Sequence, residues 1–179
     1  MGTFFAVLPV DGAAEDLRAF DRPELEGVRW EPMERLHVTI RYFDSIDPSV
    51  LDRVVEAGGR AAASIQAPRV VLGPATERLG RDGTMVIPAD GVAPLAVAVD
   101  AALIAGGLEG AVDERGEPFY GHLTLARLRR GARVPDDALG QPFHSSFVAQ
   151  ALVLIDSTHT PEGRRYEIIS DMVFGEGAS

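Results

Sequence analysis

Two short segments of the chain share a residue pattern that could carry out acid–base chemistry. His37–Ile40 and His122–Leu125 both run histidine, aliphatic, threonine, aliphatic, although they lie far apart in the sequence. Side chains alternate along a strand, so each segment would bury its aliphatic pair and present an imidazole and a hydroxyl on the other face. The chain has only four histidines, and two of them occupy the same position of this tetrad.

Two such strands placed side by side would bring both imidazoles and both hydroxyls to one phosphoester. A neutral imidazole can take a proton from an attacking water, while an imidazolium gives a proton to the departing oxygen. Threonine hydroxyls can donate hydrogen bonds to the non-bridging oxygens. We therefore take His37 and His122 as catalytic candidates, and Thr39 and Thr124 as substrate-binding candidates. The residues alone leave open which histidine is the acid and which the base. One tetrad by itself is more typical of a structural histidine, and the repetition favours function.

Further substrate-binding candidates flank the two tetrads. Arg41 has the strand parity of the first histidine, so it would face the same way and neutralise phosphate charge; a solvated arginine is the alternative. Arg127 has the opposite parity to the second histidine and reaches that face only if the strand twists or bulges. Phe119 and Tyr120 could stack on a base, with core or rim packing as the alternative. A basic loop follows, which is more typical of solvent exposure than of RNA contact (Arg129, Arg130 and Arg133).

The composition of the 179 residues excludes several classes of function. Hydrophobic residues make up 46% and charged residues 25%, as in a single globular domain. The absence of cysteine excludes thiol nucleophiles and cysteine zinc sites. All 17 basic residues are arginine, so a Walker A loop, a Schiff base and a lysine-charged ligase are excluded. The net charge of −10 argues against binding to long nucleic-acid duplexes.

No segment is typical of a signal peptide, a membrane span or a metal site. We therefore expect a soluble cytoplasmic monomer with no metal, no cofactor, no membrane contact and no protein partner.

The order of predicted elements indicates an α+β fold built on an antiparallel sheet, with helices on its outer faces. Asp11 is the expected cap of the first helix, and Asp47 followed by Pro48 marks the start of the second. The predicted strands are 3–8, 36–43, 69–72, 84–87, 120–128, 147–155 and 166–174, and the predicted helices are 11–20, 48–58 and 92–104. A hairpin is expected at the turn 82–83, and a closing hairpin across 160–163.

The paired tetrads resemble the signature of the 2H phosphoesterase superfamily, in its branch of RNA 2′,3′-cyclic phosphodiesterases, also called 2′-5′ RNA ligases. The resemblance covers nearly the whole chain (Phe4–Pro9, Arg35–Phe43, Phe119–Arg127, the strand that ends at Ser157, and Gly163–Tyr166). Two positions depart from the family pattern, which usually carries glycine where Asp44 stands and proline where Gly121 stands.

This resemblance implies one domain over residues 1–179, with two pseudo-symmetric lobes beside a central cleft. Each lobe would be an antiparallel sheet with helices on its outer face and would carry one tetrad (37–40 and 122–125). It implies metal-independent hydrolysis of a 2′,3′-cyclic phosphate to a 2′-phosphomonoester, on RNA ends or small nucleotides and without a cofactor. By analogy, His37 gives the proton to the leaving 3′ oxygen and His122 is the base for water. The alternatives are the reverse reaction, which is 2′-5′ ligation, and a non-catalytic nucleotide-binding module with the same fold.

Overall fold

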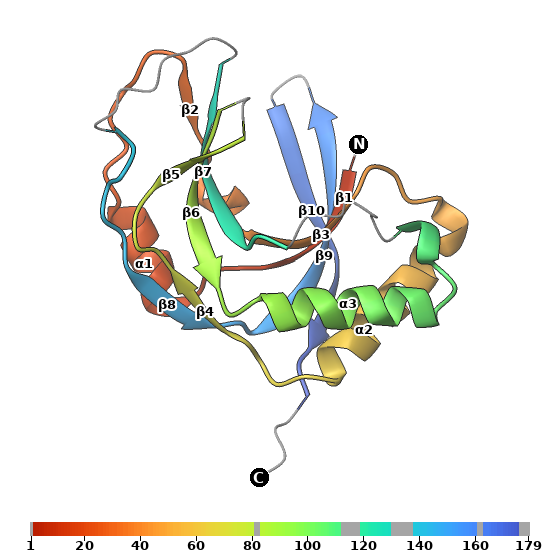
Figure 1. Ribbon diagram of the computed structural model, residues 1–179. Coiled ribbons are helices and arrows are strands. Elements are labelled where there is room, and N and C mark those ends of the chain that lie inside the picture. Colours follow the sequence, from red (N-terminus) through yellow and green to blue (C-terminus); the bar gives the residue numbers. More distant parts are fainter. Residues whose placement is uncertain (1, 81–82, 112–118, 130–137, 161–162, 176–179) are drawn as a thin grey trace.

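The computed structural model describes residues 2–80, 83–111, 119–129, 138–160 and 163–175 (Figure 1). In this part of the chain, ten strands form one antiparallel sheet and three α-helices pack on it, which confirms the α+β class. The strands are β1 (Gly2–Val7), β2 (Val28–Trp30), β3 (Val38–Phe43), β4 (Arg69–Leu72), β5 (Glu77–Leu79), β6 (Thr84–Asp90), β7 (His122–Leu128), β8 (Ser145–Val148), β9 (Ala151–Thr160) and β10 (Gly163–Val173). The α-helices are α1 (Asp11–Ala19), α2 (Leu51–Ala63) and α3 (Ala93–Ala105), and short 3-10 helices are η1 (Met33–Arg35), η2 (Pro48–Val50) and η3 (Glu109–Ala111).

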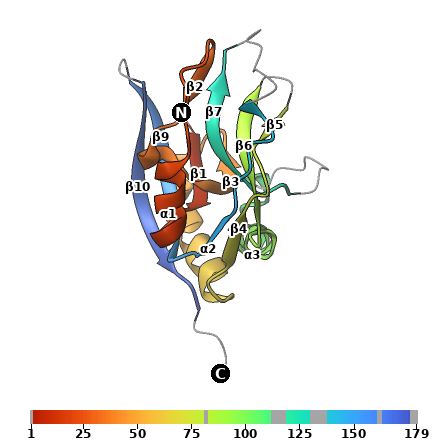
Figure 2. The ribbon, with the colours of Figure 1, turned by 90° about the vertical axis from the view of Figure 1, so that its left-hand side faces the viewer.

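The sheet consists of two halves that meet between β3 and β7. The strand order is β10-β9-β1-β3-β7-β6-β4-β8, with β2 added beside β7 and β5 beside β6. Figure 2 shows β9 and β10 on one side of the molecule and β5, β6 and β7 on the other. The only residue pair in the ladder between β3 and β7, within the described strands, is Val38 with Leu123. The two expected sheets are therefore one continuous sheet that is joined through a single pair.

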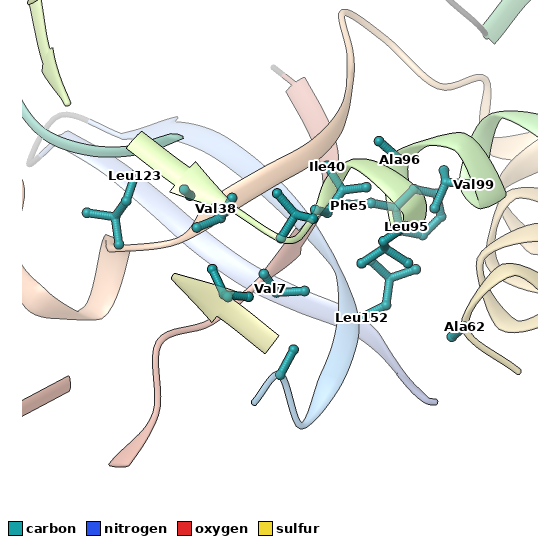
Figure 3. Packing of buried hydrophobic residues seen from close by; sticks show 14 of the residues in the cluster. Phe5, Val7, Val38, Ile40, Ala62, Leu95, Ala96, Val99, Leu123 and Leu152 are labelled. Atoms are coloured by element: carbon teal, nitrogen blue, oxygen red, sulfur yellow. The ribbon is translucent and has the colours of Figure 1, made fainter. Parts of the chain in front are cut away.

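The main hydrophobic core lies on one face of this junction. Val38 and Leu123 are fully buried, and Figure 3 shows both in the cluster that also holds Phe5, Val7 and Leu95. Helices α2 and α3 pack against each other beneath this cluster, whereas α1 packs against β8 (Figure 1). Because the aliphatic residues of both tetrads point into one core, the core fixes which way the tetrads face.

Local sequence signals account for two of the helix ends. The Asp47 carboxylate accepts a hydrogen bond of 2.8 Å from the Ser49 N–H and Pro48 follows it, so the predicted helix start is confirmed. Helix α3 ends at Ala105, one residue beyond the predicted end, and Gly106 takes the C-cap position. Asp11 is not the cap that we expected, because it lies inside α1, and Val10 takes the cap position without a side-chain hydrogen bond.

Two strand assignments from the sequence were wrong for a topological reason. Phe147 belongs to β8, which pairs with β4 in the other half of the sheet, and not to the closing hairpin. That hairpin is formed by β9 and β10. The strand that pairs with β6 in a hairpin is β5, which the sequence pattern did not indicate. The turn residues Asp82, Pro161 and Glu162 lie outside the described residues.

Helix α2 contains two adjacent glycines with opposite surroundings. A Cβ added at Gly58 would lie 2.6 Å from the Met172 sulfur and 2.6 Å from a ring carbon of Phe5, whereas one added at Gly59 would meet nothing within 4 Å. Gly58 therefore allows the helix to approach β1 and β10 closely, and Gly59 has no such role.

We predict opposite effects for alanine at these two positions. Gly59→Ala should stabilise the protein by about 0.5–1 kcal/mol, because alanine loses less backbone entropy in a helix. Gly58→Ala should destabilise it by about 1–3 kcal/mol, because the core is overpacked. Urea unfolding of both variants measures this difference, and a shift of the same sign in both would contradict the packing described for α2.

Candidate active site

The two tetrads present their polar side chains on the same face of the sheet. Paired residues of antiparallel strands point the same way, and Val38 and Leu123 both point into the main core. Their neighbours His37, Thr39 and His122 must therefore point to the opposite face, and Thr124 with them. We call this surface the histidine face.

The single pair Val38–Leu123 also brings the two histidines into one region of the sheet. His37 is the residue before Val38 and His122 is the residue before Leu123, so each imidazole comes from a direct neighbour of this pair.

Both imidazoles are held in the same way by the backbone two residues earlier. The Nδ1 of His37 lies 2.7 Å from the Arg35 carbonyl oxygen, and the Nδ1 of His122 lies 2.9 Å from the Tyr120 carbonyl oxygen. A carbonyl can only accept, so each Nδ1 carries the proton that it donates. The Nε2 of each neutral ring is therefore left as a free acceptor.

The surroundings of His37 favour its neutral form. Its ring stacks on Phe4 with centroids 4.7 Å apart, and Tyr166 meets it edge-on at 5.6 Å. Burial lowers the pKa of His37 from 6.5 to about 4; the Arg35 carbonyl and Glu31 act upward, and Arg127 and His122 act downward.

His122 has more open surroundings. Its ring stacks on Tyr120, with centroids 5.8 Å apart and an interplanar angle of 20°. The Tyr120 hydroxyl donates a hydrogen bond to the Glu77 carboxylate on β5. Partial burial, followed by this bond and the charges of Glu77 and Asp90, raises the pKa of Tyr120 to about 12, so its hydroxyl stays protonated near neutral pH. Tyr120 therefore supports the ring of His122 and leaves its other side free.

The hydroxyls of Thr39 and Thr124 are available to a ligand. Both side chains are half-buried on the histidine face. Neither hydroxyl has a hydrogen-bond partner among the protein groups of the described residues. Each can therefore donate a hydrogen bond to a ligand on the histidine face.

Arg41 does not lie on the histidine face, because β3 bulges before it. Phe5 pairs with Arg41 and Ala6 pairs with Thr39, so the residue between them is extra and the strand parity changes. Arg41 therefore follows Phe5 to the helix-covered face, where its guanidinium forms a two-pronged ion pair with Asp100 of α3. Tyr42 takes its place on the histidine face and stacks near Phe4 at 6.3 Å.

Arg127 does lie on the histidine face, and again a bulge is the reason. The register between β6 and β7 shifts near Leu125, after which Ala126 pairs with Trp30, a residue packed on the main core. Arg127 then points the other way and donates through Nε to Glu31 over 2.7 Å. The sequence predicted that this residue would need a bulge in the strand, and the bulge is present.

Glu31 and Phe4 were missed as members of the site by reasoning from the sequence, and Tyr166 entered only as part of the resemblance. Glu31 is only 6% exposed and lies between two guanidiniums, since Arg35 also approaches it at 3.7 Å. Phe4 belongs to a strand that is apolar on both faces, which indicates a second buried surface and could have revealed it. Tyr166 comes to His37 from β10, at the edge of the sheet, and no local signal predicts that contact.

Phe119 and Tyr120 are both exposed, at 38% and 44%. Among the described residues, Tyr120 has a ring contact with a tetrad histidine and Phe119 has none.

Gly121, which stands where the resembling family usually has proline, lies tightly against β6. A Cβ there would come within 2.3 Å of the Ala89 carbonyl oxygen, so the local backbone approach explains the glycine. Arg130 and Arg133 of the basic loop lie outside the described residues.

Among the described residues, no three or more His, Cys, Asp or Glu side chains come together as a metal-binding group would. In the same part of the chain, no helix has both the length and the hydropathy needed to cross a bilayer.

Comparisons with known proteins agree with this geometry. Residues 8–80 match the model of the family described as LigT like Phosphoesterase. No curated protein sequence matches the chain.

Solved structures resemble it over almost its full length. Protein TT0787 of Thermus thermophilus has 24% identity and a TM-score of 0.77, covering 99% of this chain and 100% of that one. Escherichia coli LigT in its apo form has 21% identity and a TM-score of 0.71, covering 98% of both chains. The same protein complexed with 3′-AMP has 20% identity and a TM-score of 0.71, covering 97% of this chain and 98% of that one.

The depressed pKa of His37 predicts a pH-dependent stability. Between about pH 6.5 and 4 the unfolded chain binds a proton at His37 that the folded chain does not, so stability falls as the pH falls through this window. The loss amounts to at most about 3 kcal/mol. In His37→Gln this contribution should disappear, so the variant should gain stability relative to wild type between pH 7.5 and 4.

Denaturant unfolding at several pH values measures this difference, with His159→Gln as the control for loss of an exposed histidine. A gap between wild type and His37→Gln that stays constant with pH would show that the fold does not hold His37 neutral.

Proposed function

We propose that this protein, which matches the LigT-like phosphoesterase family over residues 8–80 and shares the LigT fold, hydrolyses 2′,3′-cyclic phosphates to 2′-phosphomonoesters. Its substrates would be RNA ends or small nucleotides. The observation that supports this most is the pair of backbone-anchored imidazoles, His37 and His122, on one face beside a single strand pair. The coarser assignment, phosphoester chemistry, follows from the family.

The proposed reaction needs one neutral and one protonated imidazole. The Nε2 of the neutral ring takes a proton from water as its oxygen attacks phosphorus, and the P–O bond to the 3′ oxygen breaks. The protonated Nε2 of the other ring gives its proton to that oxygen, so protons and charge balance. Thr39, Thr124 and Arg127 would bind the non-bridging oxygens, which carry the negative charge.

The starting state of His37 bears on which role it has. In the free protein, His37 is the ring that burial keeps neutral, which suits the base. The analogy with the family instead makes His37 the proton donor. In that role, His37 must take up a proton when the substrate binds. The negative charge of the bound phosphate favours such a gain.

The same site can in principle run the reaction backwards and join a cyclic phosphate end to a 5′-hydroxyl. Incubation of a cyclic-phosphate RNA with and without a 5′-hydroxyl partner separates the two reactions, because ligation lengthens the product and hydrolysis does not. The crystal structure of LigT complexed with 3′-AMP supports nucleotide-sized ligands for LigT itself. For this chain, the free Thr hydroxyls and Nε2 atoms support catalysis over a purely binding role.

We predict that removal of either imidazole is far more costly than removal of either hydroxyl. His37→Ala and His122→Ala should each lower kcat by about 10²–10⁴-fold, the usual contribution of one proton transfer. Thr39→Ala and Thr124→Ala should lower it less, because the remaining donors still hold the phosphate. Turnover of a cyclic nucleotide measures these effects, with Arg18→Gln on α1 as the control.

Treatment with a metal chelator should leave the rate unchanged in the same assay. A single histidine variant with wild-type turnover would contradict the paired mechanism.

We further predict an unusually acidic limb in the pH profile of kcat/KM. This parameter reports the ionisations of the free enzyme, so the limb that belongs to His37 should lie near pH 4 and not near 6.5. The limb should appear whichever role His37 has, since both roles depend on its proton. Initial rates from pH 3.5 to 9 measure the profile, restricted to the range in which unfolding controls show a folded protein. A limb near 6.5 that disappears in His37→Ala would contradict the buried environment of this ring.

A further inference from the structure

A second feature of the histidine face lies beyond Arg127, at the end of β7. There a pocket of about 460 Å³ is lined by residues from the paired ends of β2 and β7. Its lining consists of Gly27, Val28, Arg29, Arg127, Leu128 and Arg129. Half of these residues are arginines, in a protein whose net charge is −10. A concave surface with this lining is suited to an anion.

The backbone register directs these arginines to one side. Arg29 pairs with Arg127 across β2 and β7, so the two side chains share a face. Arg129 follows two residues later, and its N–H donates a hydrogen bond of 2.7 Å to the Gly27 carbonyl, which extends the pairing. The pocket is therefore a continuation of the histidine face.

Most of the positive charge in the pocket is not neutralised by the residues that the structure describes. Glu31 binds Arg127 through Nε only, which leaves the two terminal nitrogens of that guanidinium. Arg29 and Arg129 form no ion pair with any of the described residues. Unpaired arginines that contact only solvent are common on a convex protein surface. Here, however, three arginines line the same pocket, and that pocket lies at the end of the strand that begins with His122.

The pocket lies within reach of the reacting groups but does not include them. Arg127 binds Glu31, which also lies 3.7 Å from Arg35, and the Arg35 carbonyl holds the ring of His37, so the near edge of the pocket is linked to that imidazole. At about 3.4 Å per residue, Arg127 lies roughly 10 Å and Arg129 roughly 17 Å along the strand from Thr124. A ligand whose reacting phosphate lies between the histidines needs a second anionic group to occupy this pocket.

We propose that this pocket is a subsite for the phosphodiester backbone of RNA upstream of the cyclic end, and that it makes an oligonucleotide a better ligand than a cyclic mononucleotide. The inference rests on the proposed function for the placement of the cyclic end. Guanidinium groups bind phosphate oxygens in two-pronged fashion. A mononucleotide has one phosphate and cannot fill both sites, whereas an RNA chain carries a phosphate at every linkage.

The test is a binding measurement that does not depend on turnover. An RNA pentanucleotide ending in a 2′-phosphate and the matching 2′-mononucleotide are titrated by fluorescence anisotropy and by competition, against wild type, Arg29→Gln/Arg129→Gln and the control Arg18→Gln. The ratio of pentanucleotide to mononucleotide affinity should fall about tenfold or more in the double variant, because charged hydrogen bonds to phosphate are lost. In the control this ratio should keep its wild-type value.

The salt dependence gives an independent readout. Each phosphate contact on a single strand contributes about −0.7 to the slope of log K against log salt, so two lost contacts should make the slope shallower by about 1.4. A pentanucleotide that binds wild type no better than the mononucleotide would overturn the subsite. So would an unchanged affinity ratio in the double variant. If no cyclic phosphate is hydrolysed and yet the ratio falls as described, the subsite stands and the proposed hydrolysis fails.

Discussion

One pair of buried aliphatic side chains, Val38 and Leu123, determines the orientation of everything that could react. The two halves of the sheet meet at this pair, and the hydrophobic effect holds both residues in the same core. Because strand residues alternate, burying this pair leaves no choice for the residues on either side of it. The histidines and threonines of both tetrads then face the same way. The core is thus the reason that two distant segments can act on one group.

The polar side of this junction is not symmetric, although the two tetrads match in sequence. Both rings are anchored through Nδ1 to a carbonyl two residues earlier, which fixes the tautomer in the same way. The rings differ in what covers them, since His37 packs between Phe4 and Tyr166, while His122 rests on an exposed tyrosine. A repeated motif therefore provides two groups whose proton affinities can differ, which acid–base catalysis needs.

Much of this arrangement could be predicted from the sequence, because the information is local. The tetrads alternate in polarity as strands do, and Asp47 with Pro48 marks a helix start. The side on which the arginines lie could not be predicted, since it depends on two bulges. One bulge turns Arg41 to Asp100 on the helix side, and the other turns Arg127 to the histidine face. A bulge results from pairing with a distant strand and leaves no clear mark in the strand itself.

The residues that surround the histidines could not be predicted from the sequence either, for the same reason. Tyr166 is more than a hundred residues from His37 in sequence, and β10 reaches it only because β9 and β1 lie between them in the sheet. The pocket of Arg29, Arg127 and Arg129 forms where β2 pairs with the end of β7, and neither strand alone indicates it. Sequence pattern thus identifies the reactive groups, whereas their electrostatic surroundings follow from the topology.

The paired mechanism requires that the Nε2 atoms of His37 and His122 flank one phosphorus centre. A crystal structure with a nucleoside 2′,3′-vanadate ester, in which vanadium stands in for the five-coordinate phosphorus, tests this requirement. Both Nε2 atoms should lie within about 2.6–3.2 Å of different oxygens of the same vanadate. A vanadate that contacts only one of the two rings, or that binds away from both, would contradict it.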